Sequence, residues 1–100
     1  MMLELIAQVE DWAKERGILE HSTARAQLLK AVSEMGELAD AEIKEDFYGQ
    51  QDAVGDVLVC LIVYCAMKGH AIGQCLTLAY EEIKNRKGHM IPGGAFVKEH

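Results

Sequence analysis

Two pairs of acidic residues have spacings that place them together on helix faces. Glu34 and Glu37 stand three residues apart, and Asp52 and Asp56 stand four residues apart. Residues so spaced share one face of an α-helix with Cβ atoms about 5–6 Å apart, so each pair presents two neighbouring carboxylates. If the two helices are antiparallel neighbours, the four carboxylates face one another and repel. Because Mg²⁺ prefers oxygen ligands, we predict a Mg²⁺ site at Glu34, Glu37, Asp52 and Asp56, with Mn²⁺ as the alternative ion.

Each pair also has an interpretation that needs no metal. A Glu-x-x-Glu pair on a helix is usually a solvated surface, and Asp52 is suited to the start of a helix, where the dipole favours an acid. Asp56 is harder to explain in this way, because it directly precedes eleven apolar residues, Val57 to Met67. Burying an ionised carboxylate without a partner is costly. Asp56 is therefore the acid that most requires compensation.

Apolar residues that recur three and four positions apart predict four helices. The first begins near Leu3 and ends at Gly17, and the others cover residues 22–45, 51–68 and 71–86, with Ser22 as an N-cap and Gly69 as a terminator. The segment "DFYGQ" is predicted to be a loop before the third helix. The tail "GHMIPGGAFVKEH" is predicted to be a loop in which "AFVKE" forms a short extended piece.

These elements predict an all-α fold in one domain covering residues 1–100. Four helices with short links favour an antiparallel four-helix bundle-like arrangement, followed by a short irregular C-terminal tail. Half of the residues are hydrophobic, which is on the high side of normal for a soluble protein and indicates that a second copy covers part of the apolar surface. We therefore expect a homodimer or a homotetramer.

Composition excludes several classes of function. The net charge of −6 argues against a nucleic-acid partner, and an anionic ligand would need a divalent cation to bind. Cys60, Cys65 and Cys75 match neither a zinc site nor a disulfide framework, which is typical of a reducing compartment. The acidic start is unlike a signal peptide, and the apolar run is about half the ~20 residues that a membrane span needs. We expect a cytoplasmic protein with no membrane partner.

Two segments resemble a known family of enzymes. The blocks "KAVSEMGELADAE" and "DAVGDVLVCLI" are similar to the MazG-like all-α nucleoside triphosphate pyrophosphohydrolases, whose signature is Glu-Glu-x-x-Glu followed by Glu-x-x-Asp on the next helix. The resemblance extends to "AYEEIKNRKGHM" and "GAFVKE", and "VEDWAKERG" is similar to the family's opening helix. It covers most of the chain from about Gln27 onward.

Three acids of this chain match the family signature, and two positions depart from it. Glu34, Glu37 and Asp56 match, whereas Ser33 and Ala53 stand where the family has glutamates. Asp52 lies one residue before Ala53, nearly on the same helix face, and is the candidate replacement. The departures leave open whether one or two metal ions bind and whether activity is reduced or lost.

The resemblance implies hydrolysis of (deoxy)nucleoside triphosphates to the monophosphate and pyrophosphate, with a role in clearing or balancing nucleotide pools. Glu37 is the candidate to orient or deprotonate the attacking water, together with Glu34. Trp12 is either a base-stacking residue or a core or interface residue, and Lys30 either contacts phosphate or pairs with Glu34. The predicted substrate-binding residues are Trp12, Gln27, Lys30, Lys84, Arg86, Lys87 and Lys98.

Two other functions stay open on the sequence. Related proteins of the same fold act on phosphoribosyl-ATP, which uses the same chemistry on a different substrate. Alternatively, the substitutions at Ser33 and Ala53 leave a catalytically weakened helical module that binds a nucleotide or a protein.

Overall fold

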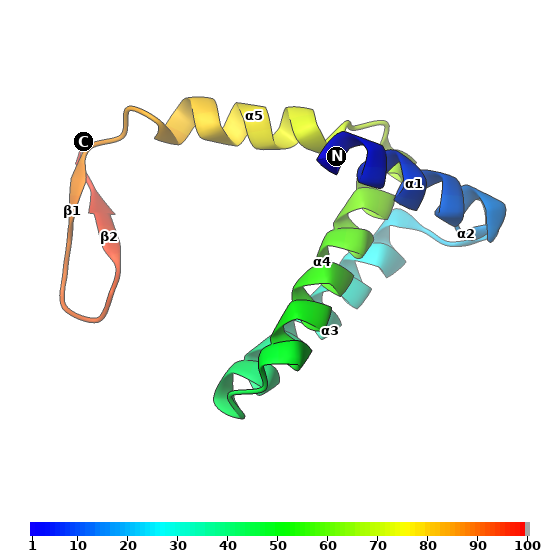
Figure 1. Cartoon of the computed structure of the whole chain (residues 1–100). Helices are drawn as coiled ribbons and strands as arrows, with labels where there is room; N and C mark the ends of the chain where they lie inside the picture. Colours follow the sequence, from blue (N-terminus) through cyan, green and yellow to red (C-terminus); the bar gives the residue numbers. More distant parts are fainter. Residues whose placement is uncertain (100) are drawn as a thin grey trace.

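The computed structural model describes residues 1–99 as a mainly helical chain (Figure 1). The predicted all-α class is confirmed. The helices are α1 (Met2–Glu15), α2 (Ile18–His21), α3 (Ala24–Ile43), α4 (Phe47–Lys68) and α5 (Ile72–Ile83). The tail contains a small antiparallel sheet of β1 (Gly88–Met90) and β2 (Phe96–Lys98), in which His89 pairs with Val97. The extended piece predicted around "AFVKE" is therefore one strand of a β-hairpin.

Side-chain caps set the starts of the two long helices. Thr23 caps α3, since its hydroxyl oxygen accepts a hydrogen bond from the backbone N–H of Ala26 at 3.0 Å. The N-cap predicted at Ser22 is therefore displaced by one residue, and the Ser22 hydroxyl instead accepts from the Gln27 amide at 3.1 Å. The short link predicted before it contains the single-turn helix α2.

The loop predicted at "DFYGQ" is wrong, because α4 begins at Phe47. Asp46 caps this helix by accepting from the backbone N–H of Gly49 at 3.0 Å. A Cβ at position 49 would collide with the Asp46 carboxylate, so glycine here permits the cap instead of breaking the helix. As a consequence Asp52 lies in the second turn of α4 and is not its N-cap.

Small side chains hold α3 and α4 together as an antiparallel helical hairpin. Ala31 and Ala41 on α3 and Ala53 and Cys60 on α4 are all buried. Helices with small contact residues approach closely, which brings the acid-bearing faces of α3 and α4 near each other. Helix α1 packs across α4, and Val63 of α4 is 1% exposed.

Helix α5 and the β-hairpin extend away from the other helices (Figure 1). None of residues 72–83 is buried, and Leu76 is 72% exposed. In the single chain, α5 therefore does not run alongside α3 and α4 as the fourth member of a closed bundle. Gly69, with a φ of 76°, ends α4 as predicted and sets this change of direction.

Helix α4 is the one helix within residues 1–99 that is long and apolar enough to cross a membrane by length and composition. The central helix of a helical bundle has the same properties, so this observation is weak evidence for a span. Only 28% of its most apolar window is buried within the chain. Much of the apolar surface of α4 thus lacks cover in a single copy.

The α3 cap gives a direct test of the observed helix start. We expect Thr23→Ala to lower the free energy of unfolding by about 1 kcal/mol, because it leaves the Ala26 N–H without its acceptor. Ser22→Ala is the matched control and should cost less than half as much. Denaturant titrations at one protein concentration measure both values. A larger loss for Ser22→Ala would contradict this helix start.

Candidate metal and nucleotide site

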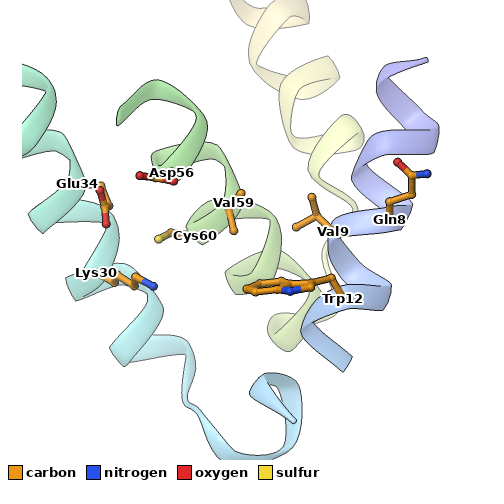
Figure 2. A pocket seen from close by; sticks show the side chains of 8 residues that line it. All are labelled: Gln8, Val9, Trp12, Lys30, Glu34, Asp56, Val59 and Cys60. Carbon is orange, nitrogen blue, oxygen red and sulfur yellow. The ribbon is translucent and has the colours of Figure 1, made fainter. Parts of the chain in front are cut away.

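A cavity of about 470 Å³ opens between α1, α3 and α4 (Figure 2). Its volume falls within the range usual for small-molecule sites. Glu34 and Asp56 lie near one another at one end, and Trp12 reaches from α1 toward Lys30 at the other. The lining is completed by Gln8, Val9, Val59 and Cys60. The cavity therefore combines an acidic end, one cation and an aromatic ring.

Glu34 is the residue of this cavity whose negative charge is least compensated by its surroundings. The side chain is half-buried, and its Oε2 atom is shielded from solvent without a hydrogen-bond partner among residues 1–99. Its pKa is raised, chiefly by the adjacent Glu37 carboxyl, with which it can share a hydrogen, then by shielding and by the charges of Glu37 and Asp56. The charge of Lys30 acts in the opposite direction, although no ion pair within 4 Å joins these two described residues.

The other two predicted ligands lie together along the same helical hairpin. Glu37 and Asp52 line a second hollow between α3 and α4, and both side chains are exposed. The antiparallel arrangement therefore sets Glu34 with Asp56 and Glu37 with Asp52. Within residues 1–99, however, no three acidic, histidine or cysteine side chains lie close enough to hold one metal ion. The four-ligand set thus stays a prediction.

The two departures from the family signature have different surroundings. Ala53 is 4% exposed and lies with buried Ala41 at the seam between the helices, where a glutamate side chain would have to displace this contact. Ser33 is exposed. Asp52 directly precedes Ala53 and is exposed as well. It is therefore the acid of α4 nearest to the position where the family has a glutamate.

The remaining predicted substrate residues fall into three places. Trp12 and Lys30 line the cavity. Gln27 does not line the cavity, and its side-chain amide donates a hydrogen bond to the Ser22 hydroxyl. Arg86, Lys87 and Lys98 surround a separate hollow at the far end of α5, and Lys84 pairs with Glu81 at 2.6 Å.

Sequence reasoning did not single out Gln8 or Cys60 as cavity residues. Gln8 lies four residues before Trp12 and hence on the same face of α1, a spacing that could have identified it. Cys60 lies four residues after Asp56, and burial raises the pKa of its thiol. The glycines near the acids, Gly36 and Gly55, have open space where a Cβ would stand.

Comparison with known proteins identifies a related sequence and a related structure. No family model matches the chain. A 60-residue segment is 33% identical to an uncharacterized 18.2 kDa protein from the rep-hol intergenic region of Haemophilus phage HP1. That match covers 60% of this chain and 37% of the phage protein, so it spans well under half of that relative.

The structural match covers the whole chain. A MazG-like pyrophosphohydrolase of cyanophage S-2L, solved with dGDP and three catalytic Mn²⁺ ions per active site, superposes with a TM-score of 0.72 over 100% of this chain and 94% of its own. The chain has a MazG-like fold. This confirms at the level of the fold the resemblance drawn from the motifs. At 19% identity this match establishes the MazG-like fold and does not establish the roles of individual residues.

The raised pKa of Glu34 predicts how metal-free protein responds to pH. The folded state holds the Glu34 proton more tightly than the unfolded chain, so this contribution to stability is present below the ordinary pKa of 4.5 and is lost as pH rises through the raised pKa. A glutamine at this position does not ionise, so the Glu34→Gln variant does not lose this stability as pH rises. In EDTA, the melting temperature of Glu34→Gln minus that of the original protein should increase as pH rises.

The control for this comparison is Glu42→Gln, which removes an exposed acid from the same helix. It should leave the difference in melting temperature nearly independent of pH over the same interval. A Glu34→Gln variant that is less stable than the original protein at neutral pH would contradict this electrostatic account.

Proposed function

We propose that the chain is a divalent-metal-dependent nucleoside triphosphate pyrophosphohydrolase. The observation that carries the proposal is the shielded Glu34 Oε2 atom, which has no hydrogen-bond partner among residues 1–99 and lies near Asp56 in a cavity that also holds Lys30 and Trp12. The MazG-like fold supports it, and the cyanophage protein of that fold binds dGDP and Mn²⁺. Nucleotide-pool housekeeping in the cytoplasm would suit such an activity.

The acidic residues fit a hard divalent cation. Carboxylate oxygens are the ligands that Mg²⁺ and Mn²⁺ prefer. The pKa of Glu34 is raised chiefly by its hydrogen bond with Glu37 and by shielding, then by the charges of Glu37 and Asp56, and a cation would neutralise those charges. Glu34 and Asp56 would hold it, with Glu37 and Asp52 completing the set. When bound, such an ion neutralises phosphate charge and lowers the pKa of a water molecule.

The side chains of the cavity and of the neighbouring hollow then have distinct tasks in the hydrolysis. Glu37, beside Glu34, would orient the attacking water and accept its proton as the water oxygen bonds to the α-phosphorus. Cleavage of the bond between that phosphorus and the bridging oxygen releases pyrophosphate. Lys30 would contact the phosphates, and Trp12 offers a ring on which a base can stack. The same arrangement would serve phosphoribosyl-ATP, which carries an adenine and a triphosphate.

Two observations favour a second candidate, a weakened nucleotide-binding module. No three potential ligands are clustered within residues 1–99, and Ala53 is buried where the family has a glutamate. Such a module would bind a nucleotide with metal and release no pyrophosphate.

We also propose that the chain works as a homodimer or homotetramer. The apolar surfaces of α4 and α5 that stay uncovered in one copy support this assembly. Burying apolar area contributes about 25 cal/mol per Å², so covering these faces would stabilise the protein considerably.

Pyrophosphate release from a panel of nucleoside triphosphates with Mg²⁺ or Mn²⁺ tests the proposed reaction. Asp56→Asn and Glu37→Gln should each reduce kcat/KM by at least about 100-fold, because removal of a ligand or water-orienting group weakens the metal site. Glu42→Gln is the matched control and should retain activity. Full activity in both site variants, with folding intact by circular dichroism, would contradict the assignment.

The position of Trp12 predicts a specific loss of nucleotide affinity. Trp12→Ala removes the aromatic ring, and base stacking is worth about 1–3 kcal/mol, so KM should rise at least about fivefold. Trp12→Phe keeps a ring and should retain most of the affinity. Equal effects of the two substitutions would assign Trp12 a role in packing alone.

A further inference from the structure

A lysine at the end of α3 faces the same seam as the acidic residues. Lys44 lines the hollow of about 340 Å³ between α3 and α4 that also holds Glu37 and Asp52. Its backbone N–H donates to the Asp40 carbonyl at 3.0 Å, and its own backbone is still helical, with φ −84° and ψ −3°. The helical geometry of α3 therefore extends to Lys44 and sets the direction of its side chain.

The spacing along α3 places this lysine in line with the acids. Steps of four and three residues keep five positions on one helix face, namely Lys30, Glu34, Glu37, Ala41 and Lys44. The two glutamates thus lie between two lysines. Glu37 and Lys44 are separated by about 10 Å along the helix axis, a distance that the tilt of the lysine side chain shortens.

The two lysines lean in the same direction and so have different neighbours. Cα–Cβ bonds of a helix tilt toward its N-terminus. Lys30 accordingly extends away from Glu34 and toward Trp12 (Figure 2). Lys44 leans back toward the turn that carries Glu37 and shares a hollow with it. Lys44 is therefore the cation that approaches the Glu37 and Asp52 part of the seam.

The ammonium group of Lys44 has acidic neighbours but no ion pair. Asp40 and Asp46 line the same hollow. Within residues 1–99, however, no carboxylate oxygen lies within 4 Å of the Lys44 nitrogen. The Asp46 carboxylate instead accepts the capping hydrogen bond from the Gly49 N–H. The exposed Lys44 side chain is thus available to a ligand in the hollow.

The proposed substrate has its charges distributed in the same order as this helix face. With the base at Trp12 and the metal at Glu34 and Asp56, the phosphates beyond the α-phosphate extend toward the second hollow. Lys30 is the one cation that lines the acidic cavity, and it lies at the base end. The terminal phosphate therefore needs a cation further along the seam.

We infer that Lys44 binds the terminal phosphate of a nucleoside triphosphate and so distinguishes triphosphates from diphosphates. This inference rests on the proposed function. An ammonium group is a compact charge with three donors, which suits a phosphate that is also partly solvated. The terminal phosphate is remote from the bond that breaks at the α-phosphorus, so this contact contributes to substrate binding and little to the chemical step.

Calorimetry in the presence of Mn²⁺ measures this preference without catalysis. The probes are a nucleoside triphosphate and a nucleoside diphosphate of each base, all with a methylene bridge between the α- and β-phosphorus. The original protein should bind the triphosphate at least about tenfold more tightly, because a hydrogen bond between charged groups is strong. Lys44→Gln should lose most of that preference and keep its affinity for the diphosphate.

Two further variants separate phosphate binding from a structural role at the helix end, where the dipole also favours a cation. Lys44→Arg keeps the charge and should keep most of the preference. Lys68→Gln is the matched control, because Lys68 is an exposed lysine at the end of α4, and it should change neither affinity. A preference that survives Lys44→Gln, or equal weakening of both analogues, would overturn the inference.

The outcomes also separate this inference from the proposed reaction. Tight binding of the triphosphate analogue that depends on Lys44, without release of pyrophosphate from natural triphosphates, supports the phosphate contact and contradicts the reaction. If pyrophosphate is released, Lys44→Gln should raise KM at least about tenfold and change kcat less than about twofold. A fall in kcat at unchanged KM, or no binding of either analogue by the original protein, would overturn the inference.

Discussion

Electrostatic repulsion between carboxylates on two facing helices is the constraint on which the rest of this structure depends. The Thr23 and Asp46 caps fix where α3 and α4 begin, and small residues such as Ala41 and Ala53 let the helices approach. Glu37, on the same helix, contributes most to the raised pKa of Glu34, and the approach of α4 adds the charge of Asp56. Packing between α3 and α4 therefore holds together carboxylates that repel one another, and a cation would stabilise this arrangement.

The sequence predicted most of the helices and the acids that share a helix face, because both follow from local periodicity. Three-residue and four-residue spacings survive small errors in helix bounds, so Glu34 pairs with Asp56 although α4 begins earlier than predicted. The start of α4 was missed because Gly49 resembles a loop residue, whereas its role is to leave room for the Asp46 cap. Cap geometry of this kind depends on side-chain contacts that periodicity does not report.

The placement of the cations could not be predicted in the same way. Arg86 and Lys98 are brought together by a β-hairpin whose pairing is not periodic, and the direction of α5 depends on the backbone at Gly69. A sequence also does not reveal whether a helix covers its own chain or another. The apolar face of α5 is found to be exposed only once the path of the chain is known.

Calorimetric titration of metal-free protein with Mn²⁺ tests the central claim most directly, because it requires no substrate and no assumption about the reaction. The account predicts saturable binding that Asp56→Asn greatly weakens and that Glu42→Gln leaves unchanged. It also predicts a higher melting temperature with Mn²⁺, since the ion binds the folded state. Absence of saturable binding to the original protein, or equal binding by Asp56→Asn, would contradict it.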